Sequence, residues 1–159
     1  MIPFNNMPPH SRAWIYQSDK EFTEKDKNIF KELSKTFLEN WMSHDKPVKG
    51  AIELFHNRFI VILIDDKDDK ACGSSIDASL RLMKELEQEL GVTLLNRMLT
   101  AYRHGGKIIS CTLSEFRTLV ENGTLNENTT VFNNLVSTKE EFEKNWEVPL
   151  ERSWHRQFV

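Results

Sequence analysis

The sequence contains little cysteine and no long apolar run. Its two cysteines among 159 residues, Cys72 and Cys111, are far apart and form no CxxC pair, so neither a disulfide framework nor a zinc site is indicated. The longest apolar run, from Phe59 to Ile64, has the length of a β-strand and is too short to span a membrane. We therefore expect no metal, no other cofactor and no membrane as a partner.

An excess of charge of one sign is also missing. The 21 basic and 24 acidic residues give a formal net charge of −3, whereas a nucleic-acid-binding protein usually carries a basic face. Nucleic acid is therefore not an expected partner. The first ten residues contain three prolines and lack the basic and apolar regions of a secretory signal, which favours a location in the cytoplasm.

The sequence also lacks a phosphate-binding loop. A P-loop ATPase needs a glycine-rich loop that ends in Gly-Lys-Ser or Gly-Lys-Thr, because backbone N–H groups and the lysine hold the phosphates. The only Gly-Lys pair, Gly106 and Lys107, is followed by Ile108 and has no earlier glycine at the required distance. We therefore expect no ATPase activity.

What the sequence does contain is the composition of a globular protein, with 39% hydrophobic and 28% charged residues. Trp14 to Gln17 is predicted to form a short strand. Thr23, with Asp26 as the third helical residue, is predicted to cap a helix that ends before Pro47. The apolar stripe of this helix recurs at helical spacing and consists of Ile29, Phe30, Leu33, Phe37, Leu38, Trp41 and Met42.

A β-hairpin is predicted next, from Val48 to Phe55 and from Arg58 to Ile64, with His56 and Asn57 at its tip. The second strand of this hairpin is apolar at every position from Phe59 to Ile64, so both of its faces have to be covered. Helices on one side cannot cover both faces. We expect either the C-terminal part of the chain or a second copy, in a homodimer, to cover the other face.

A second helix is predicted after a charged turn, with Ser74 or Ser75 as its cap and Gly91 as its left-handed end. The order strand, helix, strand, strand, helix defines an α+β body over residues 1–97. One further strand, near Thr93 to Leu99 or Lys107 to Cys111, would complete a ferredoxin-like βαββα layer.

Residues 98–159 form a separate small α+β module in this interpretation, with the possibility left open that the two parts pack as one domain. Its turn at 104–106 precedes a strand from Lys107, and Thr112 with Glu115 caps a helix that Gly123 ends. A strand at 129–132 and a last helix, capped by Ser137 or Thr138, carrying Phe142 and Trp146 and stopped by Pro149, complete the module.

The segment from Tyr102 to Phe132 resembles the GYF-like module of bacterial proteins. The shared pattern is a glycine-containing hairpin, then a capped helix with apolar Leu113, Phe116, Leu119 and Val120, then Gly123 before a returning strand. This resemblance implies a small fold that binds extended, often proline-rich, peptides. A protein or peptide is therefore the implied partner.

The whole chain is similar to a family of short bacterial proteins that carry the label ABC transporter ATPase. The similarity runs through NRFI (57–60), SID (75–77), KELEQELGV (84–92), VFNNLV (131–136), STKEEFEKNWEVP (137–149) and SWHRQFV (153–159). The ATP hydrolysis that this label implies conflicts with the missing phosphate-binding loop.

Three groups of residues are candidates for chemistry. Asp65, Asp66, Asp68 and Asp69 follow a central strand and could hold a cation, although a solvated turn is the favoured interpretation. Cys72, Gly73, Ser74 and Ser75 precede a helix, where N–H groups favour anions and lower the pKa of a thiol. A half-buried residue followed by a helix cap is the simpler explanation.

Trp154, His155 and Arg156, in the C-terminal tail, combine aromatic and basic groups that could clamp a ligand. A tail docked on the body is the favoured alternative. On this basis the leading hypothesis is a protein-interaction or regulatory module without ATPase activity. The alternative is a small enzyme or anion-binding protein that uses Cys72, Ser74, Ser75 and Asp65.

Overall fold

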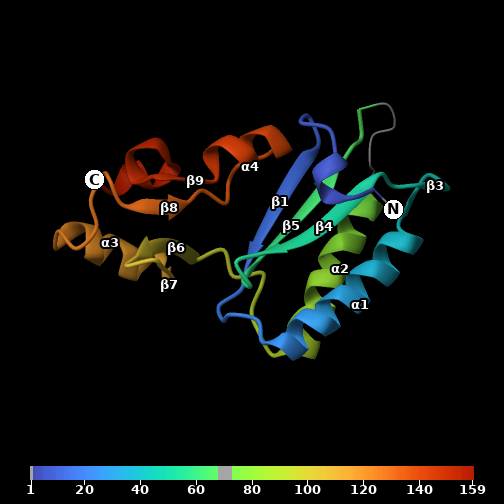
Figure 1. Ribbon diagram of the computed structural model, residues 1–159, viewed down its shortest axis with the longest axis horizontal. Coiled ribbons are helices and arrows are strands. Elements are labelled where there is room, and N and C mark those ends of the chain that lie inside the picture. Colours follow the sequence, from blue (N-terminus) through green and yellow to red (C-terminus); the bar gives the residue numbers. More distant parts are fainter. Residues whose placement is uncertain (1, 68–72) are drawn as a thin grey trace.

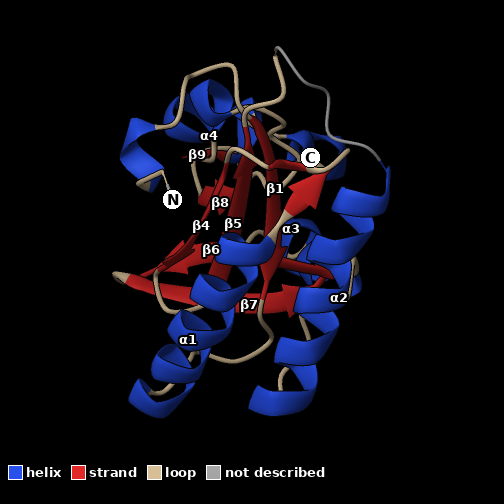
Figure 2. Cartoon of the chain, turned by 90° about the vertical axis from the view of Figure 1, so that its right-hand side faces the viewer, coloured by secondary structure: helices blue, strands red, loops and turns tan. Residues whose placement is uncertain are grey.

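The computed structural model describes residues 2–67 and 73–159, which form two antiparallel β-sheets, one of them covered by a pair of long helices (Figure 1). The expected α+β class is confirmed. The first sheet contains β1 (Arg12–Gln17), β4 (Gly50–Phe55) and β5 (Phe59–Ile64) in the order β1-β5-β4. The helices α1 (Glu24–Asn40) and α2 (Gly73–Leu90) lie side by side against one face of this sheet (Figure 2).

Local sequence signals account for the elements of this first part. Thr23 and Asp26 form the predicted capping box, in which each side chain accepts a hydrogen bond from the other residue's backbone N–H. After α1 the chain makes a short ladder of β2 (Met42–Ser43) and β3 (Lys46–Pro47). The predicted hairpin is also confirmed, because His56 and Asn57 adopt left-handed φ angles of 53° and 57° at its tip.

The start of α2 differs from the prediction. The helix begins at Gly73, so Ser74 and Ser75 lie within its first turn. The prediction that one of them caps the helix is wrong, since a cap has to precede the first helical residue. The other end agrees with the prediction: Gly91 has a φ of 64° and its N–H donates to the carbonyl of Glu87.

The second sheet is built from the C-terminal part of the chain. It contains β6 (Leu99–His104), β7 (Lys107–Thr112), β8 (Thr130–Phe132) and β9 (Glu147–Pro149) in the order β7-β6-β8-β9. The helices α3 (Leu113–Glu121) and α4 (Lys139–Asn145) begin after the caps Thr112 and Thr138. Short 3-10 turns η1 (Phe4–Asn6), η2 (Leu150–Arg152) and η3 (Trp154–Phe158) lie near the two ends of the chain.

A ferredoxin-like layer requires a fourth strand, and the described residues add none to the first sheet. Residues 93–98 are irregular, and β7 pairs with β6 through the tight Gly105–Gly106 turn, so both places suggested for that strand are wrong. Strands joined by a two-residue turn pair with each other before they pair elsewhere. At the outer edge of β1 the described part of the chain has a single bridge, between Arg12 and Thr138.

Strand β5 is buried on both faces, as its sequence predicts. Ile60, Ile62 and Ile64 pack on the side of α1 and α2. Phe59, Val61 and Leu63 pack in a second core with residues of the C-terminal part, namely Ala101, Phe132, Val136, Phe142 and Trp146. The cover for the second face is therefore the chain's own C-terminal part, and the two parts share one core.

Candidate functional site

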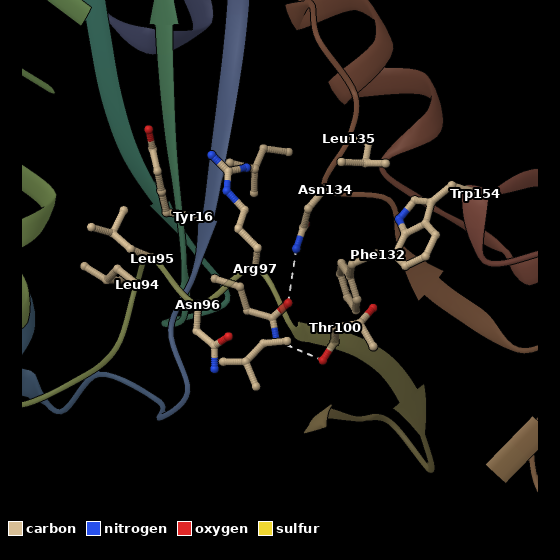
Figure 3. A pocket seen from close by; sticks show the side chains of 13 residues that line it. Tyr16, Leu94, Leu95, Asn96, Arg97, Thr100, Phe132, Asn134, Leu135 and Trp154 are labelled. Carbon is tan, nitrogen blue, oxygen red and sulfur yellow. Dashed lines mark hydrogen bonds between the residues drawn. The ribbon is translucent and has the colours of Figure 1, made fainter. Parts of the chain in front are cut away.

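A cleft lies between the two sheets, next to the outer edge of β1 (Figure 3). We call it the inter-sheet cleft. It encloses a cavity of about 80 Å³. Four separate segments line it: residues Ile15, Tyr16 and Gln17 of β1; Leu94, Leu95, Asn96, Arg97, Leu99 and Thr100 before and in β6; Phe132, Asn134 and Leu135 in and after β8; and Trp154 of η3.

The floor of the cleft is a satisfied network of amide hydrogen bonds. The side chain of Gln17 is buried, and its Nε2 donates to the carbonyl of Thr100 and to Oγ of Ser110, both at 2.9 Å. Its Oε1 accepts from Nδ2 of Asn134 at 3.1 Å, and Oδ1 of Asn134 accepts from Nε1 of Trp146 at 2.9 Å. These bonds hold β1 against the second sheet, so the floor is a fixed surface.

The backbone of β1 presents unused hydrogen-bonding groups to the cleft. Ser18 N–H donates to Arg58 on the β5 side, whereas Ala13 N–H donates to Ser137 on the opposite, outer side. Because successive residues of a strand point their backbone groups to alternate edges, Ile15 and Gln17 also point outward. In residues 2–67 and 73–159, no partner strand or other hydrogen-bond partner meets the N–H or C=O of these two residues.

The rim of the cleft combines a cation with an exposed apolar side chain. Arg97 is exposed and has no ion-pair partner among the described residues, and its side chain extends into the cleft between Tyr16 and Asn134 (Figure 3). Burial raises the pKa of Tyr16, and the nearby charge of Arg97 opposes that rise. Leu135, which also lines the cleft, is 65% exposed.

The predicted tail residues Trp154, His155 and Arg156 do not form a joint site. His155 is fully buried, with Nε2 2.6 Å from Oγ1 of Thr100 and Nδ1 2.7 Å from Oγ of Ser153. Burial lowers the pKa of His155 to about 4, so the ring is neutral at physiological pH. Arg156 is exposed, and only Trp154 reaches the inter-sheet cleft.

The contact between Ser153 and His155 resembles a nucleophile and its base, but its surroundings are those of a core. Neither side chain is accessible, and an imidazole with a pKa near 4 is a weak base at neutral pH. The bond to Thr100 instead ties η3 to β6, and the bond to Ser153 is local to the start of η3. The tail is therefore packed on β6 and α3 of the C-terminal part, and His155 belongs to the core there.

The residues predicted to form a site at the start of α2 differ in how far they are exposed. Ser74 is exposed, whereas Ser75 is buried and its carbonyl accepts from Nε1 of Trp41 at 2.8 Å. Cys72, like Asp68 and Asp69, lies outside the described residues. The other thiol, Cys111, is buried, and burial raises its pKa to about 11, which makes it unreactive.

Asp65 and Asp66, which follow β5, contact side chains of the N-terminal segment. Oδ1 of Asp65 is 2.9 Å from Nε2 of His10, and Oδ2 of Asp66 is 2.8 Å from Nη1 of Arg12. Partial burial raises the pKa of Asp65, but the hydrogen bonds from His10 and from the N–H of Lys67 outweigh it, and the net pKa is lowered. In the described residues no three His, Cys, Asp or Glu side chains gather to hold a metal ion, and no helix could cross a membrane.

Comparisons of the chain with protein-family models, with curated proteins and with solved structures find no match. What the inter-sheet cleft can bind therefore follows from its own residues. The sequence did not point to Gln17, Arg97, Asn134 or Leu135, because they come from three segments that only the fold brings together. The local feature nearest to them is the polar pair Asn133 and Asn134 before Leu135.

Proposed function

We propose that this chain is a protein-interaction module that binds an extended segment of a partner protein along the outer edge of β1. The observation that carries the proposal is the outward-facing backbone of Ile15 and Gln17. Strand edges with unpaired backbone groups bind extended peptides because the backbone of the added strand supplies the missing donors and acceptors. Thr138 and Ser137 already begin such pairing at Arg12 and Ala13, and the partner continues it.

The lining of the cleft indicates which side chains the added segment carries. Pockets for cofactors and drug-sized ligands usually measure roughly 300–1,000 Å³, so a cavity of about 80 Å³ takes a single side chain. Leu94, Leu95 and Phe132 favour an apolar side chain there. Arg97 favours an acidic residue in the same segment, because its guanidinium has no ion-pair partner among the described residues.

The similarity of residues 102–132 to a GYF-like module supports a peptide as the partner. Within that module, however, Phe116 is already covered: its ring centroid is 4.9 Å from His155 and 5.7 Å from Phe158. The chain's own tail therefore covers this aromatic side chain. We accordingly assign the peptide to the inter-sheet cleft and not to the face formed by α3.

Peptide selection followed by NMR tests the proposal. Peptides selected from a random library on the immobilised protein are titrated into isotope-labelled protein. We expect the amide signals of Ile15 and Gln17 to shift and to become protected from hydrogen exchange on binding. The substitution Leu135→Ser should weaken binding roughly tenfold, because it removes an apolar group from the rim.

The matched control is Met42→Ser, which removes another exposed apolar side chain at a place outside the cleft lining. It should leave peptide affinity unchanged. Selected peptides that perturb amides elsewhere and leave those of Ile15 and Gln17 unaffected would show that β1 is not the binding edge.

A further inference from the structure

A second depression lies where the tips of two hairpins meet, one from each sheet. It is open, measures about 530 Å³ and does not share a lining residue with the inter-sheet cleft. The tip of the β4–β5 hairpin and the end of the β6–β7 hairpin supply most of its wall. The lining residues are Glu21, His56, Asn57, Arg58, Arg103, Gly106, Lys107 and Ile108.

Positive charge predominates in this depression. Arg58, Arg103 and Lys107 contribute cations, and Glu21 is the only carboxylate in the lining. Glu147, which is not a lining residue, accepts from Nε of Arg103 at 2.7 Å and from its Nη2 at 3.1 Å. Arg58 and Lys107 have no ion-pair partner in the described part of the chain.

One of these cations, Arg103, lies against packed neighbours. The ring of His56 stacks on Trp146 with centroids 5.6 Å apart, and its Nε2 is 3.6 Å from Oε1 of Glu147. Burial and the charge of Arg103 lower the pKa of His56, against the opposing effect of Glu147. The guanidinium of Arg103 lies 5.6 Å from the ring of Phe132. These contacts hold Arg103 in place, and a fixed cation binds an anion at a smaller entropic cost.

We propose that this depression binds a phosphate-class anion, as free phosphate or as a phosphoryl group on a larger ligand. Three cationic residues line one open depression, and the carboxylates of Glu21 and Glu147 offset their charge only partly. Arginine offers N–H groups in a planar fork, and lysine offers a compact charge, which together suit the several oxygens of a phosphoryl group. Arg103 keeps N–H groups that Glu147 does not use, because the guanidinium has five.

Titration of the full chain with inorganic phosphate at low ionic strength tests this proposal, with NMR signals of the arginine side chains and the lining amides as the readout. We expect saturable shifts at Arg58, Arg103 and Lys107. The double substitution Arg58→Gln with Lys107→Gln should weaken phosphate binding at least tenfold. Glu147→Gln should tighten it several-fold, since the competing carboxylate is removed from Arg103.

The matched control is Lys31→Gln with Lys35→Gln, which removes two exposed cations from α1 and changes the net charge equally. It should keep the affinity of the unmodified protein. Equal weakening by both double substitutions would reveal attraction by net charge alone and overturn the proposal. Shifts that do not saturate, or that occur away from the depression, would overturn it as well.

Discussion

At the scale of single residues, His155 couples stability to pH. Its folded-state pKa of about 4 is below the ordinary value of 6.5, so the unfolded chain takes up this proton first as the pH falls. The contribution of the neutral ring is complete above about pH 6.5 and is lost between 6.5 and 4. A difference of this size corresponds to about 3 kcal/mol in the free energy of unfolding.

We therefore predict that His155→Gln flattens the pH dependence of stability between pH 6.5 and 4. Urea unfolding of the original chain and the variant at several pH values measures this difference. Glutamine retains groups that can bond Thr100 and Ser153 but does not titrate. If both proteins lose stability in parallel over this range, His155 does not carry the effect.

Gly50 is a second single-residue feature, at the start of β4. A Cβ atom there would lie 2.5 Å from Cζ3 of Trp41 and 3.2 Å from the carbonyl oxygen of Leu63. The ring of Trp41 is buried and its Nε1 is hydrogen-bonded to Ser75, so it cannot easily move. We expect Gly50→Ala to destabilise the protein by about 1–3 kcal/mol.

Thermal or urea unfolding of Gly50→Ala, compared with Gly73→Ala, tests this expectation. A Cβ at Gly73 meets no atom within 4 Å, and alanine is the better helix former at this first residue of α2. Gly73→Ala should therefore be neutral or slightly stabilising. Equal effects of the two substitutions would contradict a steric role of Gly50.

At the scale of elements, the helices α1 and α3 depend on their capping boxes. In each case a threonine side chain accepts from the third backbone N–H, and an acidic side chain accepts from the threonine N–H. We predict that Thr23→Ala and Thr112→Ala each lower the free energy of unfolding by about 1 kcal/mol. Ser114→Ala, within the first turn of α3, is the control for Thr112 and should change stability little.

Strand β1 should show an alternating pattern of amide protection in the free protein. The N–H groups of Trp14 and Tyr16 point to β5 and are hydrogen-bonded in the sheet, whereas those of Ile15 and Gln17 point to the cleft. Hydrogen exchange followed by NMR should therefore be faster at Ile15 and Gln17. Equal protection of all four amides would show that the outer edge is already occupied.

At the scale of the whole molecule, stability depends on the core that joins the two sheets. Without residues 98–159, the apolar face formed by Phe59, Val61 and Leu63 would lose its cover from Phe132 and Trp146. We predict that a fragment of residues 1–97 does not fold stably, because exposed faces of this kind promote aggregation. The dispersion of NMR signals from the fragment, compared with the full chain, measures this.

A matched result is expected for the full chain, which should unfold in a single cooperative transition by fluorescence and by circular dichroism. Two separate transitions, together with a folded fragment, would establish the boundary at residues 97 and 98 as a true domain boundary. A single transition and an unfolded fragment would establish one domain.

Sequence alone was informative about elements whose signals are local. Threonine caps, the His56–Asn57 turn, the left-handed Gly91 and the two-sided burial of β5 all follow from residues close in the chain, and the structure agrees with them. The fourth strand and the cap of α2 were wrongly predicted, because an apolar stretch does not reveal its pairing partner and a serine does not reveal the exact first residue of a helix.

The amino-acid sequence by itself determined where helices begin, where the chain turns and which strand is central, since hydrogen bonds and side-chain periodicity within a few residues decide these features. Only the tertiary structure decided what lies beside the edge of β1, where His155 points and which cations meet at the hairpin tips. Each of these depends on residues from distant segments, such as Gln17 with Thr100 and Asn134. Their proximity results from burying both faces of β5, and no short stretch of sequence encodes it.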